Sequence, residues 1–151
     1  MTLTIEDGSG VDGADSFATV AEFVTWSLDL MGQTVTGDEA SLRRAFVYMG
    51  GLDWLPDTYA TFDGTIPMAI KSAQCAFARA ELASPGYLSP SVTLSGKKVL
   101  TGVKGITWQV QNSPNTVEAA RPVVSMGLDY LRPYLRNLPG SSTVTSFMDR
   151  A

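Results

Sequence analysis

The residues that come nearest to a recognisable chemical motif lie in a glycine-rich stretch close to the N-terminus. Gly8, Gly10 and Gly13 fit the spacing G-x-G-x-x-G, between a short strand candidate at Thr2 to Ile5 and a predicted helix. In dinucleotide-binding folds this spacing lets backbone amides hold a pyrophosphate at a helix N-terminus. Here the strand is short and half polar, and the surrounding carboxylates would repel phosphate. A flexible turn is therefore favoured, and we expect no bound cofactor.

The same stretch contains carboxylate and hydroxyl oxygens, which are the ligands that calcium prefers. Asp7, Ser9, Asp12 and Asp15 would supply them. An EF-hand loop, however, needs glycine where Asp12 lies and a closing glutamate where Ala18 lies. A solvated acidic loop is the default interpretation and an improvised cation site is the alternative, so we expect no metal centre.

Two further patterns fall short of phosphate-binding or catalytic motifs. Ser95-Gly96-Lys97-Lys98 resembles the end of a phosphate loop, but Ser91 stands where the first glycine is needed. A basic hairpin tip is the favoured interpretation. Asp53, Asp57 and Asp63 would suit acid–base catalysis if they converged. Turn-forming aspartates are far commoner than catalytic ones, so turns are favoured here as well.

The chain has no histidine and one cysteine among its 151 residues. The lack of histidine excludes Ser-His-Asp and Cys-His nucleophile pairs and removes the commonest general base near neutral pH. Cys75 lies within a predicted helix, so we expect a buried, unreactive thiol and a reducing compartment. The protein is therefore predicted not to be an enzyme, with an enzyme that relies on carboxylates as the weakest alternative.

Nucleic-acid binding is the main alternative that the aromatic residues raise. Tryptophan side chains stack on bases in single-strand-binding proteins, which also need a positive groove. Of the three tryptophans, Trp108 is the one near clustered lysines, which are Lys97, Lys98 and Lys104. The net charge of −4 argues against broad phosphate binding. No run approaches the roughly 18 apolar residues of a membrane span, so no membrane partner is expected.

The clearest structural signal in the sequence is that of a central helix. Pro67 at its first turn sets φ without loss of a hydrogen bond, and the alanine-rich sequence that follows favours a helix to about Ala83. Ile66, Ile70 and Phe77 recur at helical spacing, and further apolar residues form a second row. A helix that is apolar around most of its circumference is expected to lie centrally and contact several neighbours.

Capping signals predict two helices before it. Thr19 to Glu22 form a capping box that opens a helix with Leu28 on its inner face. Thr36 to Glu39 repeat the signature and open a second helix, which Gly50-Gly51 ends. The aromatic-rich loop at 53–65 is expected to fold back onto the core or onto a partner.

The rest of the chain completes a mainly α prediction. Short β-rich stretches predict a β-hairpin at 88–111, and a last helix follows, broken near Pro133. Residues 1–18 are predicted to form an N-terminal arm with an acidic loop, and 137–151 a flexible polar tail. We therefore expect one small helical domain at 1–151, of about four helices with an inserted β-hairpin and extended N- and C-terminal arms.

Several stretches resemble a family of tailed-phage head-completion proteins. The family's EDGSxVxGANSY-type start is matched by two stretches near the N-terminus, Ile5-Glu6-Asp7-Gly8-Ser9-Gly10-Val11 and Ala14-Asp15-Ser16-Phe17. Phe17 stands in place of the usual tyrosine. Residues 66–75 resemble its IPxAVKxAQ helix, and Leu131-Arg132-Pro133-Tyr134-Leu135 a closing LLxPYL. The loop at 51–62 follows no family pattern. Such sequences are often catalogued as DnaT-like single-stranded-DNA-binding proteins and are also similar to head-to-tail connector, or neck adaptor, proteins.

The resemblance implies a structural virion protein. It implies a homo-oligomeric ring, twelve-fold by family analogy, that binds the portal protein and the tail-terminator or stopper proteins of the neck. Double-stranded DNA would pass through the lumen without sequence-specific binding, and the chain would be made in the host bacterial cytoplasm. The expected contact residues are Lys97, Lys98, Trp108, Trp54 and Phe147. A DnaT-like, single-strand-binding replication accessory is the alternative.

Overall fold

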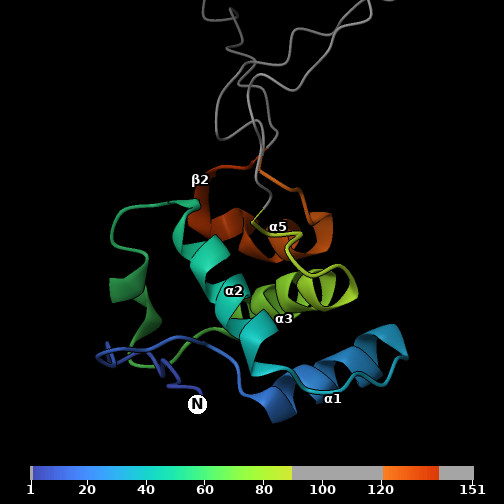
Figure 1. Ribbon diagram of the computed structural model, residues 1–151. Helices are drawn as coiled ribbons and strands as arrows, with labels where there is room; N and C mark the ends of the chain where they lie inside the picture. Colours follow the sequence, from blue (N-terminus) through green and yellow to red (C-terminus); the bar gives the residue numbers. More distant parts are fainter. Residues whose placement is uncertain (1, 90–120, 140–151) are drawn as a thin grey trace, which may run out of the picture.

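The computed structural model describes residues 2–89 and 121–139 (Figure 1). Within them the elements are α1 (Val20–Met31), α2 (Glu39–Gly50), β1 (Asp53–Trp54), η1 (Tyr59–Phe62), α3 (Met68–Ala83), α5 (Ser125–Leu131), η3 (Arg132–Tyr134) and β2 (Leu135–Asn137). The chain thus forms a small, mainly α domain, as predicted. The predicted hairpin at 88–111, beyond its first two residues, and the predicted tail beyond Pro139 lie outside the described residues.

Helix α3 occupies the centre of this arrangement, as predicted. It contacts α1, α2 and α5, which lie around it in Figure 1. Ile70, Ala73 and Phe77 on α3 are fully buried in the hydrophobic core. Pro67 immediately precedes the helix and Ser84 follows it, so both predicted ends are confirmed to within a residue. None of the helices in the described part of the chain is long and apolar enough to cross a bilayer.

Helix α1 begins and ends as its sequence predicts, but the face that it buries against the core is narrower than predicted. The Thr19 hydroxyl accepts the Glu22 amide proton and the Glu22 carboxylate accepts the Thr19 amide proton, which completes the capping box. Gly32 ends the helix in a left-handed conformation, with φ of 62°. Leu28 is 51% exposed, so its predicted inward position is wrong. Since α1 packs mainly on α3, one stripe of α1 is covered and its flank stays open.

Helix α2 begins two residues later than its capping signature predicts. Asp38, rather than Thr36, is the N-cap, and its carboxylate accepts the amide protons of Ala40 and Ser41. Gly37 passes so close to α1 that an added Cβ would lie 2.1 Å from a Val20 methyl carbon. The chain is therefore still extended when it passes α1, and the first residue able to cap is Asp38.

The described sheet is a different one from the predicted hairpin. Strands β1 and β2 pair antiparallel, with Trp54 opposite Leu135, and the Leu55 amide donates to the Tyr134 carbonyl at 2.9 Å. Between α5 and β2 the chain forms the short helix η3 around Pro133, which confirms the predicted break. Two- and three-residue strands carry too little alternation to be recognised from sequence.

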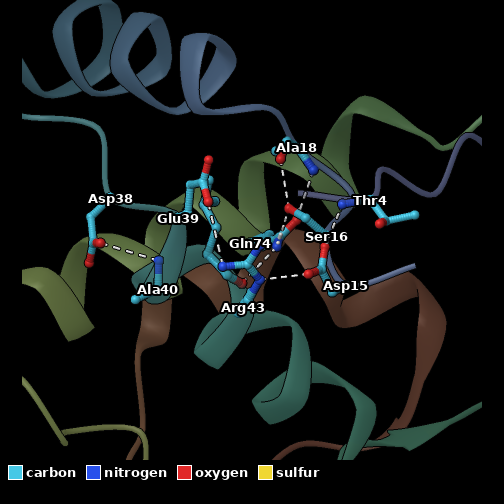
Figure 2. Close-up of polar contacts among 10 residues, drawn as sticks. Thr4, Asp15, Ser16, Ala18, Asp38, Glu39, Ala40, Arg43 and Gln74 are labelled. Carbon is cyan, nitrogen blue, oxygen red and sulfur yellow. Dashed lines mark hydrogen bonds and ion pairs between the residues drawn. The ribbon is translucent and has the colours of Figure 1, made fainter. Parts of the chain in front are cut away.

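The side chain of Gln74 joins three segments of the core (Figure 2). Gln74 is fully buried on α3. Its carbonyl oxygen accepts the amide protons of Phe17 and Ala18 at 2.8 and 2.9 Å. Its amide nitrogen donates to the Ser16 hydroxyl and to the Leu42 carbonyl on α2, both at 2.9 Å. Both donors and both acceptor positions of one side chain are used, so it fixes the N-terminal segment against α2 and α3.

We predict that Gln74→Met lowers the free energy of unfolding by about 2–5 kcal/mol, because each buried amide left without an acceptor costs about 1–3 kcal/mol. Methionine has a similar length but cannot accept the amide protons of Phe17 and Ala18. Urea unfolding measures the difference. Gln33→Leu, at an exposed position, is the control and should shift stability by less than about 0.5 kcal/mol. Equal stabilities for Gln74→Met and the unsubstituted chain would contradict this role.

Helix α5 approaches α3 closely at Gly127. A Cβ added there would lie 2.7 Å from the Phe77 ring, which is fully buried and cannot move aside. We predict that Gly127→Ala destabilises the protein by about 1–3 kcal/mol through overpacking. Gly50→Ala is the matched control, since its methyl group meets open space and restricts the unfolded chain. Thermal melts should show a lower Tm for the first variant and an equal or higher Tm for the second.

Candidate interaction surface

The glycine-rich stretch near the N-terminus folds around the chain's own carboxylate. One oxygen of Glu6 accepts the amide protons of Gly8 and Gly10 at 2.8 and 3.0 Å, and the other accepts that of Val11 at 2.8 Å. Glu6 is only 4% exposed and also hydrogen-bonds the Tyr59 hydroxyl. The amides that would hold a nucleotide phosphate are therefore already paired with an internal anion.

The charge of Glu6 is stabilised by these contacts. Burial opposes ionisation, but the hydrogen bonds from Tyr59 and from the loop amides outweigh it and hold the pKa of Glu6 below its ordinary value. Burial, together with the bond to Glu6, raises the pKa of Tyr59. The loop and the η1 turn are thereby joined through one charge-assisted pair.

A second carboxylate ties the same loop to α2 (Figure 2). Asp15 accepts the Thr4 amide proton at 2.7 Å and the Arg43 Nε proton at 2.6 Å. Burial raises the pKa of Asp15, but the bonds from Arg43 and Thr4 prevail and lower it overall. Glu39, one turn before Arg43 on α2, also pairs with that guanidinium at 3.5 Å.

The four oxygen-bearing residues of the calcium alternative do not converge. Asp7 accepts the amide and hydroxyl protons of Ser9, Asp12 is exposed, and Asp15 faces Arg43. Over residues 2–89 and 121–139, no three acidic or cysteine side chains form a group that could hold a metal ion. Cys75 is buried in α3, and burial raises the pKa of its thiol to about 12, as expected of an unreactive cysteine.

Asp53, Asp57 and Asp63 also serve separate local purposes. The Asn137 side-chain amide donates a hydrogen bond to the Asp53 carboxylate across the β1–β2 pair, with 2.7 Å between Nδ2 and Oδ2. Asp57 and Asp63 adopt left-handed conformations, with φ of 61° and 49°, which aspartate tolerates better than most residues. Their geometry is that of turn residues, which is the interpretation favoured by the sequence.

An aromatic pocket of about 530 Å³ opens beside these turns. We use this name for the cavity lined by Phe17, Phe46, Gly50, Trp54, Leu55, Asp57, Thr58, Tyr59, Ala60, Phe62 and Ile70. The indole N–H of Trp54 donates to the Met49 carbonyl at 2.7 Å, which holds Trp54 in the pocket wall. The rings of Tyr59 and Phe62 lie 5.5 Å apart, and Phe62 is buried. The loop at 53–65 thus folds back onto the core, as predicted.

The basic side chains of the described residues are largely committed to internal partners. These residues include thirteen acidic and seven basic side chains. Four of the seven basic side chains form ion pairs, which are Arg43 with Asp15, Arg44 with Glu81, Lys71 with Glu22, and Arg132 with Asp129. The described surface therefore carries an excess of negative charge and no cluster of free cations is found on it.

Glu81 fixes the point where the chain leaves the described core, and Tyr87 connects that point to the point of re-entry. Glu81 is fully buried and accepts the amide protons of Gly86 and Leu88 at 2.7 and 2.9 Å while it pairs with Arg44. The Tyr87 hydroxyl donates to the Val123 carbonyl at 3.4 Å. Residues 87 and 123, which flank the segment 90–120, therefore lie side by side.

Of the expected contact residues, Trp54 is described and lines the aromatic pocket. Lys97, Lys98, Trp108 and Phe147 lie outside the described residues. Sequence reasoning assigned no role to Glu6, Gln74 or Glu81. Gln74 and Glu81 did carry a signal, since each interrupts an apolar helix with a polar side chain. Such a residue is tolerated in a core only when its hydrogen bonds are satisfied.

Comparison with sequence models of known protein families gives a match over the whole chain. A sequence model of the family described as "Putative DnaT-like ssDNA binding protein" matches residues 1–151. The chain belongs to this family. No curated protein and no solved structure matches it. In this DnaT-like chain, the glycine-rich loop encloses the buried Glu6 carboxylate, and the central helix carries the buried Gln74.

We predict that Glu6→Gln lowers the free energy of unfolding at pH 7 by about 1.5–3 kcal/mol, the usual contribution of a hydrogen bond to a charged group. Because the folded-state pKa of Glu6 lies below its ordinary 4.5, its contribution is present above that pH and is lost as the pH falls through the folded-state value. Denaturant unfolding at pH 7 and pH 3 should show the gap narrowing in acid. Asp12→Asn, an exposed carboxylate in the same loop, should show no such gap.

Proposed function

We propose that this DnaT-like protein is a head-to-tail connector subunit of a tailed bacteriophage. It would assemble as a ring between the portal and the tail, complete the head and let double-stranded DNA pass. The observation that carries the proposal is the charge of the described core, where acidic side chains outnumber basic ones and most cations are paired internally. The family resemblance of the N-terminal loop and the central helix agrees with it.

The excess of negative charge suits a channel through which DNA passes better than a surface that binds DNA tightly. A protein that binds DNA tightly neutralises several phosphates with lysine and arginine side chains. A wall with few free cations makes few such contacts and so does not hold the moving duplex. The acidic residues that stay exposed, such as Asp7, Asp12 and Asp29, keep the surface repulsive toward phosphate.

The surface also offers apolar area for contacts between subunits. Large apolar side chains that are at least half exposed include Leu28 and Leu30 on α1, Val47 on α2 and Met68 on α3. Leu30 and Met68 line one cavity together with Trp26 and Tyr130, and a contiguous apolar patch of this kind is typical of a contact surface between subunits. The ring, its partners in the portal and neck, and its location in the virion are parts of this proposal, as is the absence of catalysis.

A single-strand-binding replication accessory is the second candidate. The family's description favours it, as do Lys97, Lys98 and Lys104 near Trp108, which lie outside the described residues. Against it stands the charge of the described part, which offers no basic groove for a phosphate backbone.

Electron microscopy of intact particles tests the connector directly. We expect this chain to form a collar ring beneath the portal and to be detected by mass spectrometry in purified, genome-filled particles. The capsid protein of the same particles is the positive control. Particles that contain capsid, portal and tail proteins but lack this chain would rule the proposal out.

Binding to a labelled oligothymidine separates the two candidates. Under the connector proposal, fluorescence anisotropy shows no binding to the oligothymidine between 50 and 200 mM salt. Binding through phosphate contacts would instead weaken over this range, with the logarithm of the binding constant falling against the logarithm of the salt concentration by about 0.7 per contact. Strong binding with that slope, lost in Lys97→Ala/Lys98→Ala but kept in the control Arg132→Ala, would favour the single-strand-binding candidate.

A further inference from the structure

The aromatic pocket defined above lies in an acidic surrounding. Asp53, Asp57 and Asp63 lie on the loop that forms its outer wall, and Asp57 lines it. No lysine or arginine occurs from Ala45 to Ile70 in the sequence. An occupant of this pocket should therefore combine an apolar or aromatic side chain with nearby positive charge.

The walls of the aromatic pocket are held in place before any partner arrives. Tyr59 is hydrogen-bonded to buried Glu6, and the Trp54 indole to the Met49 carbonyl. On the opposite wall, the rings of Phe17 and Phe46 are in contact, with centroids 4.8 Å apart. A preformed apolar pocket binds a side chain without the cost of ordering its own walls.

The chain itself contains one segment with the matching chemistry. Residues 90–120 carry three lysines and one glutamate, together with Ile106 and Trp108. Residues 140–151, by comparison, carry one aspartate and one arginine. The acidic loop therefore attracts residues 90–120, which are net positive, and has no net electrostatic attraction to residues 140–151, which are neutral.

Residues 90–120 re-enter the described core on the face of α2 that carries Tyr48, and the Arg121 side chain reaches from there to Gly51 at the end of the helix. Pro122, next to the end of that segment, accepts a hydrogen bond from Tyr48 on α2 at 2.7 Å. Phe46 and Gly50, which line the pocket, lie on the other face of α2, because two residues along a helix are about 200° apart. Helix α2 thus lies between the pocket and the base of its own segment. Within the proposed ring, a neighbouring copy presents the same segment.

We propose that the aromatic pocket of one subunit receives an apolar side chain of the 90–120 segment of a second copy, with the segment's lysines facing Asp53, Asp57 and Asp63. This inference rests on the proposed ring, for which it supplies a contact between neighbours. Pocket and segment base are different surfaces, so the contact is heterologous and repeats head to tail. Such contacts close into rings when the rotation between copies permits.

Photo-crosslinking in the full-length chain tests the contact. A benzophenone amino acid replaces Ala60, an exposed residue in the pocket wall, and ¹⁵N-labelled and unlabelled chains are mixed and irradiated. We expect adducts between labels that map to residues 90–120. The same probe at Val47, which is 72% exposed on α2 outside the pocket, is the matched control and should give few such adducts.

Charge reversal gives an independent readout. Lys97→Glu/Lys98→Glu should lower the adduct yield between labels about three- to tenfold, since attractive contacts become repulsive, and added salt should lower the yield of the unsubstituted segment. Adducts confined to one label, adducts to residues 140–151, or no adduct at position 60 would overturn the inference. Those outcomes leave the collar in particles intact, whereas loss of the collar density removes the proposed function whatever the adducts show.

Discussion

The Gln74 side chain connects parts of the chain that are far apart in sequence. It lies on α3 and bonds to residues 16–18 and to α2, so three segments share one amide group. Because the site is fully buried, no water replaces a lost partner, and the geometry of all three segments is fixed together. The closed loop around Glu6 and the wall of the aromatic pocket both depend on this anchoring, since Phe17 belongs to the anchored segment and lines the pocket.

Some of the carboxylates act inside the protein as hydrogen-bond acceptors and do not contribute to its acidic surface. Glu6 and Glu81 are buried and act as acceptors for backbone amides, at loops that would otherwise have unpaired donors. Asp38 does the same at the start of α2. With Glu6 and Glu81 buried, eleven acidic and seven basic side chains remain over residues 2–89 and 121–139, so the described surface keeps a negative excess.

Local signals were sufficient for the helices and insufficient for the contacts between them. The Thr19–Glu22 capping box and Pro67 each fix a helix start within a few residues, so α1 and α3 were predicted correctly. Contacts between distant segments determine the remaining features. Helix α2 starts later than predicted because the chain at Gly37 packs against Val20 of α1. The β1–β2 pairing joins segments that no local sequence pattern relates. Trp54, which the sequence suggested as a contact residue, lines the aromatic pocket. The pocket itself could not be predicted, because it depends on the three-dimensional arrangement of the loop.

The hydrogen bond between Tyr87 and Val123 has a consequence for variation among related chains. It brings together the two points of the helical bundle between which residues 90–120 lie in the sequence. The entropy of closing an insertion grows slowly with its length, by about 0.6 kcal/mol for each doubling. Insertions of quite different length and composition can therefore be exchanged at this junction with little thermodynamic effect on the bundle, which leaves evolution free to change specificity while the scaffold is kept.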